Sequence, residues 1–359
     1  MDMRYAVIMA GGPGRRLWPI SRTNRPKQLL PLIGGKDLLS IAVERLAGVF
    51  ENENILVITN AEYADQVVRA LPQLPQENIV GEPDRRDTAV AIALAAELLA
   101  ARDEDATMAM FTADHIIRPK EEFVRCVGLA CEAAEANSDA LVTFGIRPSW
   151  PHTGLGYVEC DKALRDGLYE VRAFKEKPDH QAARRYVESG KHYWNSGMFV
   201  WKLTGIRQAL EEFLPQSLEK LAPVGRAARD GKDYTGMLKE IYPTLEKISI
   251  DYAVMEKAAK VLMVELTCQW LDVGDWPALA DVSDLDEGGN AVVAENVALL
   301  DSFRNVIVSD NGHLLAVVGM DDCIVVHSCD ATLVCNKSDS QRLKQLVAML
   351  EEKYGSKYL

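Results

Sequence analysis

The sequence lacks any uninterrupted apolar run long enough to span a membrane, and its best candidate, residues 89–101, contains Glu97. The seven cysteines are odd in number and include no C-x-x-C pair, which argues against a disulfide framework and a structural zinc site. Basic residues are scarce, because 40 Lys and Arg stand against 53 Asp and Glu, a net charge of −13. These absences predict no membrane partner, no nucleic-acid partner and a location in the reducing cytoplasm.

The length and composition are those of an ordinary globular protein. The chain has 359 residues, of which 48% are hydrophobic and 26% charged, so extensive disorder is excluded. At roughly 150 residues per domain, this length predicts about two domains.

The first part of the chain alternates between apolar runs and segments of helical periodicity. This alternation predicts an α/β fold, in which a mostly parallel sheet carries helices on both faces. Ligands bind such sheets beyond the carboxyl ends of the strands. The expected strands are residues 3–10, 54–59, 79–80, 107–112 and 140–145, and the expected helices are residues 37–50, 61–71, a long alanine-rich helix capped by Asp87 or Thr88, and residues 123–136.

The chain is expected to divide near residue 285. An acidic, glycine-ended stretch at 281–289 reads as a linker, and short apolar runs separated by turn residues follow it. An amphipathic helix is expected from residue 340 to about 354. The sequence therefore predicts a large domain at 1–280 and a small β-rich domain with a final helix at 290–359.

The charge is unevenly spread along this acidic chain. Residues 1–30 hold several cations and a single acid, Asp2; the cations are Arg4, Arg15, Arg16, Arg22, Arg25 and Lys27. Such a group either binds a small, highly charged anion or forms a solvated basic face.

A glycine loop follows the first expected strand, with the sequence G-G-P-G-R-R-L-W-P at residues 11–19. It matches neither G-x-x-x-x-G-K-[ST] nor G-x-G-x-x-G, so neither standard nucleotide fingerprint applies. Glycines let backbone N–H groups approach an anion, and an arginine beside them adds charge-assisted hydrogen bonds. A tight strand-to-helix turn requires the same residues, so the loop alone does not establish a phosphate site.

The extended loop resembles the signature of sugar-1-phosphate nucleotidyltransferases, most closely those that transfer guanylate to mannose 1-phosphate. Further segments of the chain carry the same resemblance in order: R-P-K-Q-L-L-P at 25–31, G-E-P-D-R-R-D-T-A at 81–89, T-A-D-H at 112–115, F-G-I-R-P at 144–148, T-G-L-G-Y at 153–157, F-K-E-K-P at 174–178, N-S-G-M-F-V-W at 195–201 and W-L-D-V-G-D-W at 270–276. The resemblance implies a Rossmann-like nucleotidyltransferase domain with a smaller β appendage.

The resemblance also implies roles for individual residues. Asp114 and Asp272 match the family's metal-binding carboxylates, and with Arg16 and Lys27 they form the implied catalytic set. His115, beside Asp114, is expected to serve a structural role. The implied sugar-phosphate site comprises Gly156, Glu176, Lys177 and Asn195. The implied nucleotide site comprises Gly11, Gly12, Gly14, Arg15, Arg16, Lys27, Glu82, Arg86, Thr88 and Asp114.

The implied reaction is an in-line attack of mannose 1-phosphate on GTP, assisted by Mg²⁺ and carried out by a homodimer. A phosphate monoester is already an anionic nucleophile, so no general base is needed. Three alternatives remain open at this point: an enzyme for another nucleotide and sugar 1-phosphate, a non-catalytic regulatory paralogue, and a nicotinamide dehydrogenase. Retention of the charged residues disfavours the paralogue, and the missing G-x-G-x-x-G disfavours the dehydrogenase.

Overall fold

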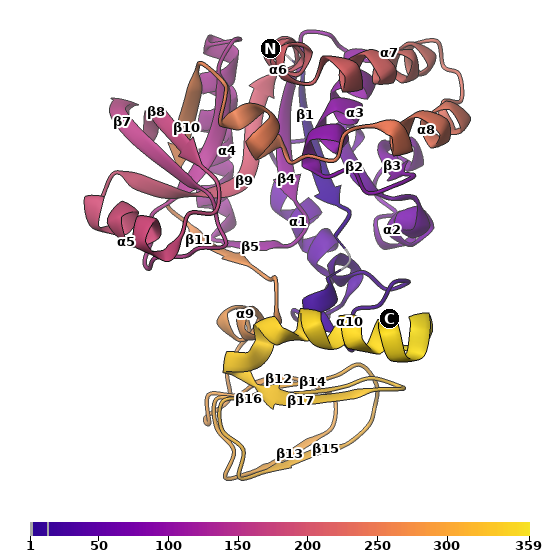
Figure 1. The fold of residues 1–359 in the computed structure, drawn as a ribbon, viewed down its shortest axis with the longest axis vertical. Helices are drawn as coiled ribbons and strands as arrows, with labels where there is room; N and C mark the ends of the chain where they lie inside the picture. Colours follow the sequence, from indigo (N-terminus) through magenta and orange to yellow (C-terminus); the bar gives the residue numbers. More distant parts are fainter. Residues whose placement is uncertain (1–2, 13) are drawn as a thin grey trace.

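The computed structural model describes residues 3–12 and 14–359. A nine-stranded sheet forms the centre of the larger part, in the order β3-β2-β1-β4-β9-β6-β10-β8-β7 (Figure 1). Its strands are β1 (Arg4–Ala10), β2 (Ile55–Asn60), β3 (Ile79–Glu82), β4 (Thr107–Thr112), β6 (Leu141–Ile146), β7 (Tyr157–Arg165), β8 (Leu168–Lys175), β9 (His192–Lys202) and β10 (Val261–Glu265).

The expected α/β class and the mostly parallel strand direction are confirmed. The pairings β3–β2–β1–β4 and β6–β10 are parallel. Two strands run against the rest: β9, inserted between β4 and β6, and β8 near the edge. The order 3-2-1-4 on one side is that of a Rossmann-like sheet.

Both faces of the sheet are buried, which explains the continuous apolar runs. Along β1, Tyr5 and Val7 enter one hydrophobic core, whereas Ala6 and Ile8 enter the other. The first core is completed by α3 (Thr88–Ala100), α6 (Leu203–Phe213), α7 (Pro215–Arg229) and α8 (Thr235–Ile241). The second is completed by α1 (Leu38–Leu46), α2 (Ala64–Ala70), α4 (Lys120–Ala136) and α5 (His180–Ser189).

Side-chain caps begin two of these helices where the sequence predicts them. The Asp37 carboxylate accepts a hydrogen bond from the N–H of Ser40 at 2.7 Å, which starts α1. Asp87 is the N-cap of α3 and accepts from the N–H of Thr88 at 2.8 Å. Such caps satisfy N–H groups that have no partner within the helix.

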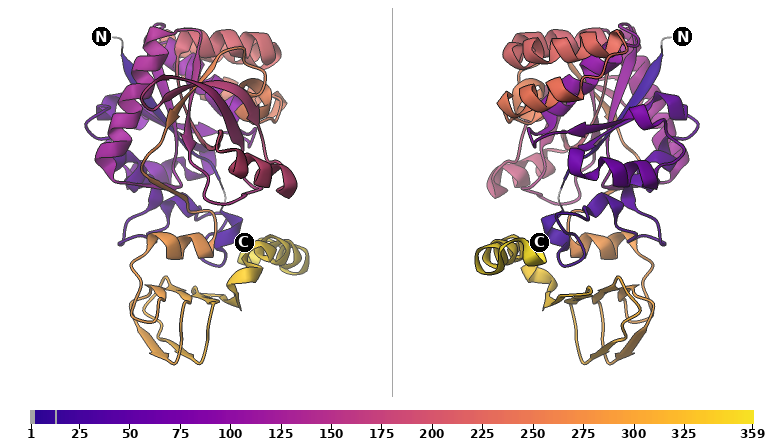
Figure 2. Two further views of the ribbon diagram at one scale, coloured as in Figure 1. Left: turned by 90° about the vertical axis from the view of Figure 1, so that its left-hand side faces the viewer. Right: turned by 90° about the vertical axis from the view of Figure 1, so that its right-hand side faces the viewer.

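The C-terminal unit, residues 290–359, is a small coil of strands below the large sheet (Figure 2). β12, β13 and β14 each pair in parallel with the strand two places further along, which gives the ladders β12-β14-β16 and β13-β15. β17 extends the first ladder by pairing antiparallel with β16. Its elements are β12 (Ala291–Val293), β13 (Val297–Leu300), β14 (Val306–Ser309), β15 (Leu315–Val318), β16 (Cys323–His327), β17 (Thr332–Asn336) and α10 (Leu343–Tyr354).

A third hydrophobic core joins the C-terminal unit to the larger part. Leu17 and Trp18, from the loop after β1, pack in one cluster with Val306 of β14 and Val347 of α10. The helix α9 (Trp276–Val282) contributes Trp276, whose indole N–H donates to the carbonyl of Trp18 at 3.0 Å. The C-terminal unit therefore packs directly against the segment that carries the glycine-rich motif.

No helix in the described ranges is long and apolar enough to cross a membrane. Every cysteine among the described residues is a free thiol, in agreement with the expected absence of a disulfide framework.

Candidate active site

The carboxyl ends of three strands in the parallel half of the sheet, β1, β3 and β4, carry several of the predicted residues. Gly11 and Gly12 follow β1, Glu82 ends β3, and Asp114 lies two residues beyond β4. A Cβ added to Gly11 would stand 3.3 Å from a carboxylate oxygen of Glu82, so β3 approaches the glycine loop closely. The expected edge of the sheet is therefore the one that carries these groups.

The glycine loop turns sharply around the side chain of Lys27. Gly14 has φ = 65°, and a Cβ at this position would clash with the Cβ of Lys27. Both the left-handed backbone and the close approach require glycine here. The hydroxyl of Ser21 donates to the carbonyl of Gly14 at 2.7 Å and fixes the turn. Pro13 of the motif lies outside the described residues.

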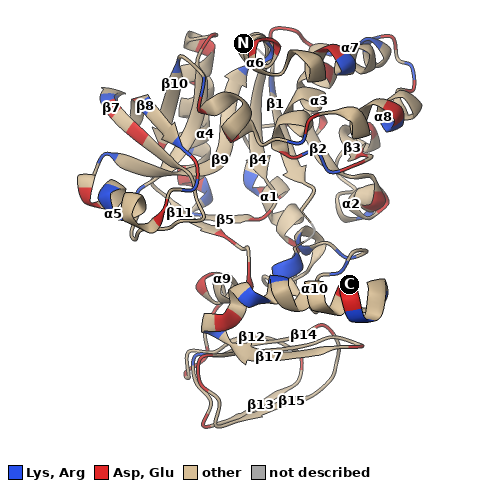
Figure 3. Ribbon diagram, viewed as in Figure 1, with Lys and Arg blue, Asp and Glu red and all other residues tan. Residues whose placement is uncertain are grey.

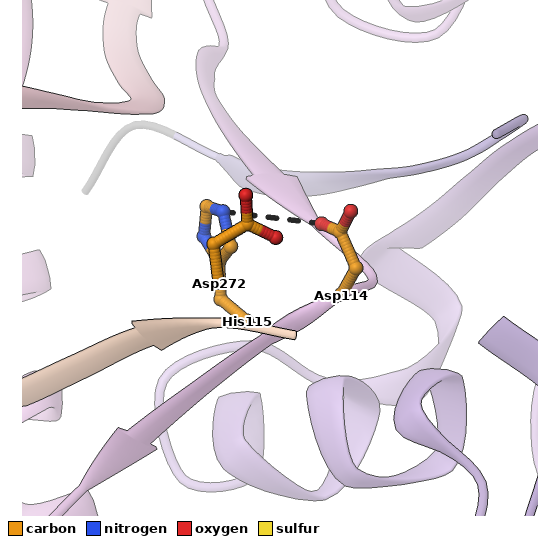
Figure 4. A group of neighbouring side chains, drawn as sticks. All are labelled: Asp114, His115 and Asp272. Carbon is orange, nitrogen blue, oxygen red and sulfur yellow. Dashed lines mark ion pairs between the residues drawn. The ribbon is translucent and has the colours of Figure 1, made fainter. Parts of the chain in front are cut away.

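A small antiparallel ladder places Asp272 beside Asp114, although the two are far apart in sequence. The strands β5 (His115–Arg118) and β11 (Gln269–Asp272) pair so that Asp272 lies opposite His115. The next residue, Val273, donates its N–H to the carbonyl of Asp114 at 3.0 Å. Figure 4 shows both carboxylates and the imidazole of His115 around one small space.

The Lys27 ammonium lies between the two carboxylates. Its Nζ is 2.6 Å from Oδ2 of Asp114 and 4.0 Å from Oδ1 of Asp272, and it donates to the carbonyl of Val273 at 3.3 Å. Lys27 is 8% exposed. Burial alone lowers the pKa of this ammonium, but attraction to the two carboxylates outweighs it and raises the pKa. Lys27 is therefore a permanently charged group in this site.

The two carboxylates have opposite pKa shifts. Burial opposes ionisation of Asp114, yet the Lys27 ammonium outweighs it and holds the pKa of Asp114 well below its usual range. Burial, followed by repulsion from Asp114, raises the pKa of Asp272 to about 6. Oδ1 of Asp272 is buried and has no hydrogen-bond partner among the described residues. Its nearest cation is the Lys27 ammonium at 4.0 Å, and a buried carboxylate oxygen without a hydrogen bond is stabilised further by a cation that approaches more closely.

His115 is held as a neutral imidazole. The indole N–H of Trp270 donates to its Nδ1 at 3.1 Å, and burial lowers its pKa to about 4. Its Nε2 lies 3.9 Å from Oδ1 of Asp114. Ligand atoms of Asp114, His115 and Asp272 all lie within 4.8 Å of one another, so these three side chains form a candidate metal site.

The basic residues of the N-terminal loop separate into two groups. Arg16 faces the carboxylates: its guanidinium lies over Gly274, and its Nη1 is 3.9 Å from Asp275. Arg15 instead lies 3.7 Å from the carboxylate of Glu351 in α10, although the family resemblance implies nucleotide contact for both. Figure 3 shows this basic loop beside α10.

Two further arginines bind the C-terminal unit. Arg22 pairs with Asp330 at 2.6 Å, and Arg25 pairs with Asp310 at 2.5 Å. Arg4 lies at the start of β1 and pairs with Glu135 at 2.6 Å. The N-terminal cations therefore do not form one group, because these three side chains pair with carboxylates distant in sequence.

The implied nucleotide-site residues Glu82, Arg86 and Thr88 lie at the end of β3 and in the segment that leads into α3. The hydroxyl of Tyr242 donates to Oε1 of Glu82, and burial raises the pKa of this carboxyl group to about 7. Arg86 pairs with Asp84 at 2.6 Å. Thr88 begins α3, and its hydroxyl accepts the N–H of Ile250 at 2.9 Å. Nucleotide contact by Glu82, Arg86 and Thr88 stays a prediction.

The four implied sugar-site residues come together on β7, β8 and β9. Glu176 and Lys177 follow β8 and pair at 2.5 Å. A Cβ on Gly156 would clash with Oε2 of Glu176, so any larger residue there would displace this carboxylate. Asn195 lies in β9, and its Cβ would be 3.5 Å from a Cβ added at Gly156. Their contact with a sugar phosphate also stays a prediction.

Sequence reasoning missed Asp251, which joins this sugar-side group. It begins the π-helical turn η7 (Asp251–Met255), and its Oδ1 accepts a hydrogen bond from Nδ2 of Asn195 at 3.0 Å. Burial, followed by the charge of Glu176, raises the pKa of Asp251 to about 7. The available signal was a single acid within the largely apolar run at 248–255.

Comparisons with known proteins agree with this arrangement. A family model described as nucleotidyl transferase matches residues 5–288, and a model described as a MannoseP isomerase/GMP-like beta-helix domain matches residues 295–350. Mannose-1-phosphate guanylyltransferases from Klebsiella pneumoniae and Escherichia coli are 39% and 38% identical, each over 99% of this chain and 76% of the relative. A crystal structure from Thermus thermophilus, described as a mannose-1-phosphate geranyltransferase, has a TM-score of 0.85 and 33% identity over 97% of this chain and 99% of that one.

Proposed function

The chain belongs to the nucleotidyl transferase family, and on that premise we propose that it transfers GMP from GTP to mannose 1-phosphate. The products are GDP-mannose and pyrophosphate. The names of its relatives supply the substrates. The observation that carries the chemistry is the group of Lys27, Asp114 and Asp272 at the carboxyl edge of the sheet, where phosphates of a nucleotide bind in such folds.

In the proposed reaction, a phosphate oxygen of mannose 1-phosphate attacks the α-phosphorus of GTP. The new bond is P–O, and the bond that breaks is the one to the departing pyrophosphate. The nucleophile is already an anion, so the chain supplies no general base. Its own contributions are the cations of Arg16 and Lys27, the backbone N–H groups of the glycine loop, and the orientation of the two substrates.

A divalent ion fits the proposed site. Asp114 and Asp272 would hold it. The observation that supports them as ligands is the buried Oδ1 of Asp272, which accepts no hydrogen bond from the described residues. We propose Mg²⁺, because a few carboxylate oxygens combined with phosphates and water are its usual ligands. When bound, this ion would offset negative charge on the transferring phosphoryl group.

The cellular location, the domain boundaries and the oligomeric state are proposed as well. The reaction is placed in the cytoplasm, which the free cysteines support. The chain is divided at 1–280 and 290–359. A homodimer is proposed, and exposed apolar side chains on the C-terminal unit support it: Leu300 and Val318 are adjacent on β13 and β15 and are 58% and 64% exposed.

The central test is a pyrophosphate-release assay of the purified chain with GTP, ATP, UTP and dTTP, each combined with several sugar 1-phosphates. The expected result is turnover with GTP and mannose 1-phosphate well above every other pair. A different preferred pair would replace the proposed substrates but keep the reaction type. No turnover with any pair would overturn the proposal. Sedimentation velocity of the same sample measures the oligomeric state.

A further inference from the structure

Asp251 lies outside the sugar-site motifs but is hydrogen-bonded to Asn195, which belongs to one of them. Asn195 accepts the hydroxyl of Thr143 at 3.0 Å and the N–H of Gly197 at 3.3 Å, both on its Oδ1. Those bonds fix the amide so that Nδ2 points at Oδ1 of Asp251, 3.0 Å away. Asp251 thus lies against a residue that the family resemblance assigns to the sugar.

The segment that carries Asp251 is anchored from two directions. The N–H of Ile250 donates to the hydroxyl of Thr88, and the N–H of Ala89 donates to the carbonyl of Ile248 at 3.2 Å. Just beyond η7, Glu256 accepts the N–H of Glu176 at 3.0 Å. One short stretch therefore determines the position of Asp251 and of the backbone that carries Glu176.

Glu176 supplies a second, independent sign of a ligand. Its side chain is only 6% exposed, and Oε1 is taken by Lys177. Oε2 is buried without a hydrogen-bond partner among the described residues, and it lies beside Gly156, where it would clash with an added Cβ. A buried, unpartnered carboxylate oxygen is costly, so it calls for a donor that arrives with a ligand.

We propose that Asp251 is a specificity-determining residue of this sugar site and accepts a hydrogen bond from one ring hydroxyl of the hexose. Glu176 accepts from another hydroxyl, while Lys177 faces the phosphate. The inference rests on the proposed function. Hydroxyl groups are the donors that such carboxylates require, and a site that pairs with a hydroxyl strongly rejects an analogue lacking it.

The test compares the wild-type chain with Asp251→Asn on mannose 1-phosphate and its 2-, 3-, 4- and 6-deoxy analogues. Asparagine keeps the shape and can still accept from Asn195. We expect the variant to lower kcat/KM for mannose 1-phosphate by about 10- to 100-fold, mainly through KM, and to leave the KM for GTP unchanged. Asp230→Asn is the matched control, since Asp230 is an exposed acid paired with Lys232 at 2.8 Å.

The deoxy series separates a direct contact from a structural effect. In the wild type, removal of one particular hydroxyl should cost about as much as the substitution. In Asp251→Asn, removal of that same hydroxyl should cost almost nothing further. If every deoxy penalty persists in the variant, or if the KM for GTP rises equally, the assignment is wrong. Asp251→Ser provides the same comparison should the asparagine variant fail to fold. If the wild-type chain shows no activity with mannose 1-phosphate and GTP, the proposed function itself is contradicted.

Discussion

The Nζ of Lys27 lies 2.6 Å from Oδ2 of Asp114, and this largely buried ion pair joins the N-terminal segment after β1 to the turn after β4. Each partner stabilises the charged form of the other, because attraction raises the pKa of the ammonium and lowers that of the carboxyl group. Breaking a buried pair on one side leaves an uncompensated charge, which is strongly destabilising. Substitutions at this pair must therefore be read against the melting temperature as well as activity.

The first prediction is that Asp114 and Asp272 act through one divalent ion. Asp114→Asn and Asp272→Asn should each lower Mg²⁺ affinity and turnover together, and the double variant should be much less than additively worse. Steady-state kinetics over a Mg²⁺ titration, with the melting temperature as a control, provide the measurement. Near-normal activity of either single variant at sub-millimolar Mg²⁺ would remove that residue from the shared site.

A second prediction concerns the pH dependence of stability. Glu82 has a pKa of about 7 in the folded chain because it is buried, whereas an unfolded glutamate titrates near 4.3. Folding is therefore favoured by the protonated form below the unfolded pKa, and this contribution is lost as pH rises through about 7. Relative to Glu82→Gln, the wild type should lose about 3 kcal/mol between pH 4.5 and 7.5. Parallel denaturation curves of the two proteins would show no pH-dependent difference if Glu82 titrates normally.

The strands were predictable because burial on both faces leaves an unambiguous apolar run. The expected strand at 107–112 coincides with β4, and the expected strand at 54–59 differs from β2 by one residue at each end. The region from β7 to β9 gave no such signal. The β7–β8 ladder contains register shifts, and the outer half of β7 is exposed, so a regular alternation is absent.

Long-range pairings account for what the sequence could not show. Asp272 reaches Asp114 only through the β5–β11 ladder, so the pairing depended on the family resemblance. The carboxylates that neutralise Arg22 and Arg25 lie 308 and 285 positions away. Asp251 was missed for a related reason: no local spacing indicates that η7 packs beside Asn195.

The third prediction assigns Lys177 to the sugar phosphate. Lys177→Ala should weaken use of mannose 1-phosphate by about 2 kcal/mol and change the KM for GTP little, because it removes a cation that pairs with Glu176 of the proposed sugar site. Lys191→Ala, at a nearby exposed position, is the control. Initial rates with each substrate varied in turn give the two KM values. An equal rise in both would contradict the assignment of Lys177 to the sugar phosphate.

The last prediction is that an apolar core, not the ion pairs, holds the C-terminal unit in place. In each of the two ion pairs one partner is partly exposed, at 41% and 38% respectively. Ion pairs open to solvent contribute about 0–1 kcal/mol each, so Asp310→Asn combined with Asp330→Asn should lower stability only slightly and leave the protein soluble. Deletion of residues 290–359 should instead uncover Leu17 and Trp18, which pack against β14 and α10, and cause aggregation or a changed oligomer. Light scattering after size-exclusion chromatography, together with thermal melts, compares the two variants. A soluble deletion variant with the native number of subunits would show that the loop after β1 does not depend on this core.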